Sequence, residues 1–240
     1  MRDYLSATSL TQQPCMVQSA DMGGATCLFR AMTEADIPQV YAIDHEAFPA
    51  ESLFRPYSSY ARELQNPMAH YIVACLPSEH RLRQRRTSLF KRLVRRYPPS
   101  ETPCYDELLV GFAGFWTMLD EAHIIAIAVS EQYKRQGIGE GLLVSVIDMA
   151  AKLQSNLLTL EVRLNNVTAQ SLYAKYGFEV VGRRPRYYSD NQEDAILMTL
   201  HNLQSPDFRT HFVDVKASVL ARHCLTHSVA TPAIAAEFEG

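Results

Sequence analysis

The chain has 240 residues, of which 47% are hydrophobic and 20% are charged, with a formal net charge of −3. These values are ordinary for a soluble globular protein with one domain and appendages, and no apolar run approaches the length of a membrane span. The five cysteines are scattered without CxxC or Cys/His ligand spacing, which argues against a disulfide framework and a zinc site and favours a reducing, cytoplasmic compartment.

The first segment, residues 1–26, is expected to be a disordered leader. It starts with Arg2 and Asp3 but has no apolar core, so a secretory signal is not expected. Residues 4–26 are rich in Ser, Thr and Gln and contain no basic residue, which argues against an organellar targeting peptide.

The next fifty residues predict two strands around two helices. Thr33 can cap the first helix, whose apolar residues recur at helical spacing. The expected elements are a strand at 28–32, a helix at 34–47, a short helix at 57–64 and a strand at 71–75.

A basic insertion, residues 77–105, holds eight basic and two acidic residues. The rest of the chain then has 15 basic and 24 acidic residues, a balance of −9, and such an acidic body attracts a cationic substrate. Apolar residues between Leu89 and Tyr97 fall at helical spacing among arginines. The insertion is either a solvated, partly disordered hairpin or a basic amphipathic helix that docks on RNA, such as that of the ribosome, on an anionic membrane or on a partner.

The remaining chain predicts a strand–helix–strand unit at the centre of a mixed α/β domain. The run 124–129 is continuously apolar, which is typical of a strand buried on both faces. Gly177 suits the left-handed end of a helix. The expected elements are strands at 108–119, 124–129, 157–162, 180–182 and 195–200, a tight turn at 120–121, and helices at 137–153 and 167–176. No element is assigned to 203–240.

A glycine loop, Lys134-Arg135-Gln136-Gly137-Ile138-Gly139, stands between the apolar strand and the long helix. Glycines let the backbone approach a ligand closely, and a helix start offers free N–H groups and a positive dipole end to phosphate. Such a loop alone is weak evidence, because an ordinary tight turn has the same composition. Its place between a buried strand and an amphipathic helix favours phosphate binding.

Two ionisable side chains beyond this loop are of the types that move protons in catalysis: a carboxylate can accept a proton, and a phenol can donate one. Glu161 in a strand and Tyr173 in the following helix are the right types for these two tasks. The alternatives are a solvated strand glutamate and a core tyrosine.

The loop resembles the Gln/Arg-x-x-Gly-x-Gly/Ala motif of the GNAT acetyltransferase superfamily, with Lys134 at the first position. The string Glu161-Val162-Arg163, then Asn166, Leu172-Tyr173 and Gly177-Phe178, resembles the ribosomal-protein-alanine acetyltransferases of the RimI type. The resemblance implies a mostly antiparallel sheet that splays at a central parallel strand pair and is flanked by helices, with acetyl-CoA as cosubstrate and no metal.

The resemblance also implies roles for individual residues. Glu161 would be the general base and Tyr173 the general acid. The backbone of 127–129 would pair with the pantetheine arm, the amides of 135–140 would face the pyrophosphate, and Asn166 would contact the cofactor. The implied cofactor residues are Ile127, Ala128, Val129, Arg135, Gln136, Gly137, Ile138, Gly139, Glu140 and Asn166.

The acceptor side is less well defined. Ala47-Phe48-Pro49 and Tyr187-Tyr188 match family signatures near the peptide's entry, so Phe48, Pro49, Tyr187 and Tyr188 are the candidates. Where relatives have Pro-Trp-Ser, this chain has Arg55-Pro56-Tyr57-Ser58. Three further residues remain open between a surface and a substrate role: Arg183, Arg184 and Arg186. The histidines at 45, 70 and 123 are interpreted as structural.

We therefore expect an acetyltransferase domain at 27–200 and a C-terminal extension of unknown role at 201–240. The expected reaction is direct transfer of acetyl from acetyl-CoA, in a ternary complex, to a protein N-terminus. The first candidate acceptor is the N-terminal alanine of a small-subunit ribosomal protein. Two alternatives are a broader N-terminal or small-amine acetyltransferase and a non-catalytic module that binds acetyl-CoA or the ribosome.

Overall fold

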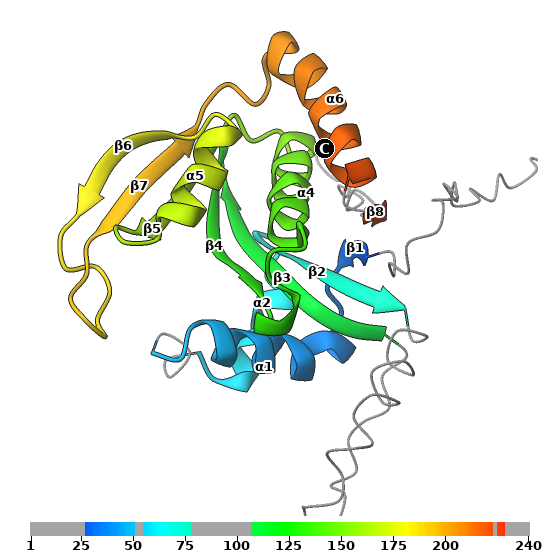
Figure 1. Ribbon diagram of the computed structural model, residues 1–240, viewed down its shortest axis with the longest axis vertical. Coiled ribbons are helices and arrows are strands. Elements are labelled where there is room, and N and C mark those ends of the chain that lie inside the picture. Colours follow the sequence, from blue (N-terminus) through cyan, green and yellow to red (C-terminus); the bar gives the residue numbers. More distant parts are fainter. Residues whose placement is uncertain (1–26, 51–54, 78–106, 223–224, 229–240) are drawn as a thin grey trace, which may run out of the picture.

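The computed structural model describes residues 27–50, 55–77, 107–222 and 225–228, which build an eight-stranded sheet (Figure 1). The sheet order is β6-β7-β5-β4-β3-β2-β1-β8. Neighbours are antiparallel except for the parallel pairs β4–β5 and β1–β8. The strands are β1 (Cys27–Ala31), β2 (Ala69–Pro77), β3 (Glu107–Met118), β4 (Glu121–Val129), β5 (Leu157–Arg163), β6 (Glu179–Arg184), β7 (Ala195–Leu200) and β8 (Leu225–Ser228).

Helices cover both faces of the sheet. The 3-10 turn η1 (Glu34–Asp36) leads into α1 (Ile37–Ala47), which lies with α2 (Tyr57–Leu64) against one face. The opposite face carries α4 (Ile138–Lys152), which follows η4 (Glu131–Tyr133), and Figure 1 shows α1 and α4 on opposite sides of β3 and β4. The remaining helices are α5 (Val167–Lys175) and α6 (Pro206–Arg222). Each face has its own hydrophobic cluster, so the sheet is a buried middle layer.

A β-bulge in β4 decides which residues face which layer. The register against β3 shifts so that Ile125 has no partner of its own, while Ile124 and Ala126 are paired. Ile124 and Ile127 pack with the hydrophobic cluster on the face that carries α4, called here the α4-side cluster. The consecutive Ile125 and Ala126 both pack with the cluster on the face that carries α1, the α1-side cluster. Two successive residues therefore point to the same side, as a bulge requires.

The predicted elements are confirmed, with changes at their ends and in one burial assignment. The start and end of α2 agree with the prediction, and α4 agrees within a residue. The run 124–129 was expected to be buried on both faces, and this is wrong: Ile125, Ile127 and Val129 are only partly buried. The turn between β3 and β4 lies one residue earlier than expected, at 119–120, where Leu119 adopts a positive φ of 57°.

The C-terminal residues, to which the sequence assigned no element, contain α6 and β8. The connection from β7 is held by Gln204, whose Nε2 donates to the carbonyls of Ala151 and Ser155 at 2.9 and 2.8 Å. Lys216 of α6 reaches the Asp148 carboxylate of α4 at 2.7 Å, and β8 then adds to the sheet beside β1. Figure 1 shows α6 beside α4, so this segment continues the α4 side of the fold.

The predicted leader 1–26 and nearly all of the basic insertion 77–105 lie outside the described residues. In the part of the chain that the structure describes, no helix has the length and apolar character needed to cross a membrane.

The link between α6 and α4 predicts a pH-dependent loss of stability for Lys216→Met. Burial raises the pKa of Asp148, but ion pairs with Lys216 and Lys152 outweigh this and hold it below its ordinary value of 3.8. Losing the ion pair with Lys216 should lower the free energy of unfolding by about 1 to 2 kcal/mol, because the buried carboxylate keeps one charged partner fewer. A depressed carboxyl pKa stabilises the fold above the unfolded value, so the difference from wild type should shrink as pH falls below about 4.

Chemical denaturation across pH 3 to 8 measures this difference. The control is Arg209→Met, an exposed residue of the same helix, which should change stability by less than about 0.5 kcal/mol. Equal stability of Lys216→Met and Arg209→Met at pH 7 would contradict the assignment.

Candidate active site

The two parallel strands at the centre of the sheet separate, and this opens one edge of β4. Pairing of β4 with β5 ends at Ile124 opposite Leu160, whereas pairing of β4 with β3 continues to Val129. Among the described residues, the backbone of 125–129 therefore has a strand partner on one side only. Figure 1 shows β5, β6 and β7 turning away from β4. The free edge can accept an extended ligand with amide groups, as predicted for Ile127, Ala128 and Val129.

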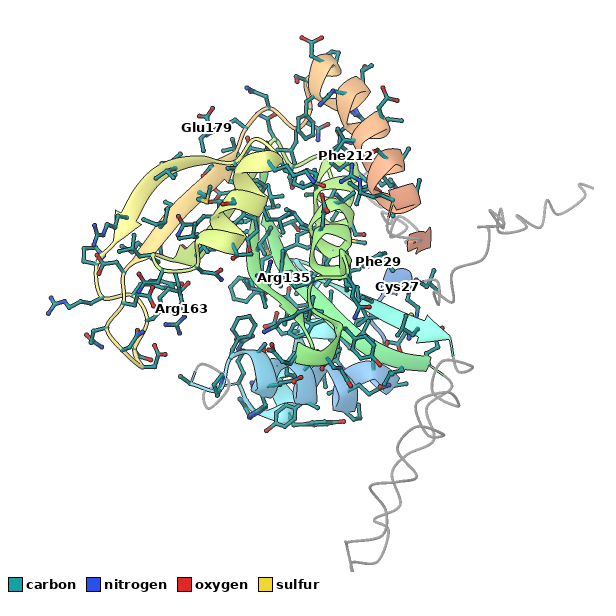
Figure 2. All side chains as sticks on the ribbon, in the orientation of Figure 1. Cys27, Phe29, Arg135, Arg163, Glu179 and Phe212 are labelled. Carbon is teal, nitrogen blue, oxygen red and sulfur yellow. The ribbon has the colours of Figure 1, made fainter. Side chains whose placement is uncertain are left out.

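The loop that precedes α4 has the backbone conformation expected of a phosphate site. Gly137, the N-cap of α4, has a φ of 80°, and Arg135 has a φ of 63°. A left-handed conformation costs an L-residue such as Arg135 about 1 to 2 kcal/mol. The first N–H groups of α4 have no partner within the helix, and they can bond to an anion. Figure 2 labels Arg135 in this loop.

The Glu140 side chain is engaged by the neighbouring helix α5. Its carboxylate accepts a hydrogen bond from the Tyr176 hydroxyl at 2.6 Å and pairs with Lys175. The side chain is 12% exposed. Glu140 therefore offers a phosphate only its backbone N–H, while Lys175 offsets the carboxylate charge near the helix start.

Asn166 lies at the start of α5 and acts as its cap. Its Oδ1 accepts a hydrogen bond from the backbone N–H of Ala169 at 3.1 Å. This capping role was expected from the sequence. Contact of Asn166 with the cofactor stays a prediction.

The carboxylate of Glu161 is buried in β5 and has two basic partners. Its side chain is 5% exposed, Oε2 lies 2.6 Å from Nε2 of His123, and Oε1 lies 3.0 Å from Nη2 of Arg184. The approach of Arg184 makes an ion pair without hydrogen-bond geometry. Burial raises the pKa of Glu161, but His123 and then Arg184 outweigh it, so the pKa lies below its ordinary value. The carboxylate is therefore ionised at neutral pH.

His123 is a site residue that the sequence analysis missed by interpreting it as structural. In the parallel pair, His123 of β4 is in register with Thr159 of β5, and Glu161 is two residues further on the same face. The signal in the sequence was the placement of a histidine one residue before the apolar run. It could be used only after the register of β4 on β5 was known.

Tyr173 lies in α5 and packs against the α4-side cluster, with its ring 5.7 Å from that of Phe178. Burial raises the pKa of Tyr173 to about 12. The hydroxyl therefore keeps its proton at neutral pH, which suits a proton donor.

The paired tyrosines occupy different surroundings. Burial and then the charge of the Glu161 carboxylate raise the pKa of Tyr187, and the guanidinium of Arg184, which pairs with Glu161, lies 5.7 Å from the Tyr187 ring. Tyr188 instead stacks under Arg163, at 3.9 Å from the ring centroid. Figure 2 labels Arg163 at the end of β5. Of the two, Tyr187 is the one that the structure brings to Glu161.

An ion pair that the sequence did not predict ties Arg55 to α1. Arg55, which stands where relatives have the Pro-Trp-Ser motif, lies 2.9 Å from the fully buried Asp44 and 5.7 Å from the Phe48 ring. The backbone N–H of Phe48 donates to Asp44 of α1, and its ring lies beside Arg55. Contact of Phe48 and Pro49 with an acceptor stays a prediction.

In the described part of the chain, no three His, Cys, Asp or Glu side chains lie close enough together to hold a metal ion.

Comparison with known proteins agrees with this geometry. Residues 38–178 match the model of the "Acetyltransferase (GNAT) family". A Bacillus subtilis relative named "Putative ribosomal protein bS18-alanine N-acetyltransferase" is 33% identical over 70% of this chain and 91% of its own length. The ribosomal protein bS18-alanine N-acetyltransferase of Escherichia coli K12 is 43% identical over 38% of this chain and 64% of its own length.

The crystal structure of the ribosomal-protein-S18-alanine N-acetyltransferase from Escherichia coli superimposes with a TM-score of 0.54. The match covers 74% of this chain and 94% of that structure, with 27% identity.

The left-handed loop predicts unequal effects of two alanine substitutions. Gly137→Ala adds a Cβ to a residue whose φ is 80°, and this left-handed backbone conformation costs an alanine about 1 to 2 kcal/mol. The loop should shift to relieve this strain, and the dissociation constant for acetyl-CoA should rise about tenfold. In the control Gly139→Ala, the nearest atom to the new Cβ is Val129 Cγ2 at 3.7 Å, an ordinary contact, so affinity should change little. Calorimetric titration measures both, and equal affinities would argue against a phosphate loop.

Proposed function

The chain belongs to the acetyltransferase (GNAT) family and is an acyltransferase, and from this premise we propose that it acetylates the α-amine at a protein N-terminus. The observation that carries the proposal is the fork where β4 and β5 separate: a free strand edge lies there beside the buried Glu161 carboxylate and its partner His123. We propose residues 27–200 as the catalytic unit, with 201–240 as an extension.

Acetyl-CoA fits the open edge of β4 and the loop that precedes α4. It supplies a thioester, whose carbonyl carbon takes the acceptor nitrogen as its thiolate leaves. The backbone of Ile127–Val129 would hold the pantetheine arm, and the amides of 135–140 would hold the pyrophosphate. This assignment is supported by the one-sided pairing of β4 and by the left-handed backbone at Arg135 and Gly137.

The proposed acceptor is the N-terminal alanine of a small-subunit ribosomal protein. Support comes from the names of the Bacillus subtilis and Escherichia coli relatives, the first matched over 91% of its length. The acidic balance of the chain outside the basic insertion favours a cationic acceptor of this kind. A broader N-terminal or small-amine acetyltransferase is the alternative, because Arg55, which is paired with Asp44, stands where relatives have the Pro-Trp-Ser motif.

Two residues would move the protons. Glu161 carries the base function, because it is ionised at neutral pH and lies at the fork. Tyr173 is the proton donor to the leaving thiolate, since a phenol is protonated at neutral pH and the raised pKa of Tyr173 keeps it so. The presence of both groups argues against a non-catalytic module.

Removing either group should slow turnover without loss of cofactor binding. Glu161→Gln and Tyr173→Phe should each lower kcat by about 100-fold or more, while the affinity for acetyl-CoA changes little. Steady-state kinetics and calorimetric titration separate the two effects. Wild-type turnover in both variants would refute the assigned roles.

The acceptor is tested with purified protein, acetyl-CoA and synthetic peptides that begin with alanine, serine, glycine or methionine, together with small polyamines. Mass spectrometry should find acetylation first at the α-amine of alanine peptides taken from small-subunit ribosomal proteins. Preferential acetylation of polyamines, or of lysine side chains, would overturn the proposed acceptor.

A further inference from the structure

The contact between His123 and Glu161 joins a partly exposed base to a buried carboxylate. Nε2 of the imidazole lies 2.6 Å from Oε2 of the carboxylate, within hydrogen-bond distance. The His123 side chain is 36% exposed, against 5% for Glu161. An amine that arrives from solvent therefore reaches the ring more readily than it reaches the carboxylate.

The carboxylate itself is poorly placed to take a proton directly. One oxygen is bonded to His123 and the other is paired with Arg184 at 3.0 Å. A proton on either oxygen would break a favourable interaction with a positively polarised partner. The lowered pKa of Glu161 reflects the same preference for the ionised form.

The position of His123 agrees with the proposed path of the cofactor. The pyrophosphate would lie at 135–140 and the pantetheine arm along Ile127–Val129, so the arm would run back along β4 toward its fork with β5. His123 precedes Ile124, the last residue of β4 that pairs with β5. The reactive end of the arm would thus come toward the imidazole.

We propose that His123 is the catalytic residue that takes the proton from the acceptor amine, and that Glu161 positions its ring and stabilises the imidazolium. A neutral imidazole can donate Nε2–H to Glu161 and accept a proton at Nδ1. The ammonium form of the acceptor loses one proton to Nδ1, and its freed lone pair attacks the thioester carbonyl. The nitrogen loses its second proton as the carbon–sulfur bond breaks, and this proton replaces on Tyr173 the one that the phenol gives to the leaving thiolate. The partly exposed ring returns the proton on Nδ1 to water after the product leaves. The inference rests on the proposed transfer to an amine and refines the base function given to Glu161.

A purely structural role for His123 predicts different results. It would only bridge β4 and β5 and fill space beside the carboxylate. Any ring of the same size would then replace it, whatever its basicity, whereas a proton acceptor must be basic.

The test is chemical rescue of His123→Gly in the full chain. Its kcat should fall about 100-fold or more, with little change in acetyl-CoA affinity or melting temperature. Added imidazole should restore turnover in a saturable way, whereas 1,2,4-triazole, which has nearly the same shape but is a much weaker base, should not. His123→Gln, which keeps a donor toward Glu161 but has no basic nitrogen, should be as slow as the glycine variant.

The matched control is His70→Gly. His70 is also a partly buried strand histidine, with Nε2 3.0 Å from Thr117 Oγ1, but it lies in β2, two strands away from β4. Its turnover per folded molecule should equal that of wild type and should not respond to imidazole. Wild-type turnover in His123→Gln, equal rescue by triazole, or a slow His123→Gly that imidazole does not rescue would each overturn the proposal.

The wild-type protein, assayed in parallel on peptides and small amines, reports separately on the proposed function. The ratio of variant to wild-type turnover is measured on whichever amine is acetylated. Acetylation of a different class of acceptor would therefore overturn the proposed function. The ratio of variant to wild-type turnover on that acceptor would still test the role of His123.

Discussion

The site depends on one constraint, which is the loss of pairing between β4 and β5 after Ile124 and Leu160. Because backbone N–H and C=O groups need partners, an unpaired edge inside a sheet is costly unless water or a ligand bonds to it. The bulge at Ile125 lies at the same point and changes which residues of β4 face α4. The fork thus produces both the edge proposed to bind the cofactor and the place where the proposed catalytic side chains Glu161 and His123 meet.

Burial and charge are balanced at this fork. A carboxylate that is 5% exposed persists as an anion because a histidine from β4 and an arginine from β6 flank it. These partners come from the two strands that flank β5 and β7 in the sheet order, so the site needs both halves of the splayed sheet. The same groups that keep Glu161 ionised also weaken it as a base. This favours the partly exposed imidazole of His123 as the proposed proton acceptor.

Much of the fold was predictable because it depends on local patterns. Helical spacing located α2 and α4, a glycine located the end of α5, and the glycine loop located the start of α4. The errors have physical reasons. Strand 124–129 was expected to be buried on both faces, but a bulge and a missing neighbour strand leave Ile125, Ile127 and Val129 only partly buried. The helix α6 was missed because only two of its residues are buried, so its apolar pattern is weak.

The sequence by itself determined the family resemblance, the order of the elements and the residue types for acyl transfer, since these follow from motifs and periodicity along the chain. Only the tertiary structure decided which groups act together. His123 and Glu161 are separated by 38 positions, and Glu161 and Arg184 lie on different strands, so strand register brings them into contact. Register depends on long-range pairing and on the bulge, which no local pattern encodes.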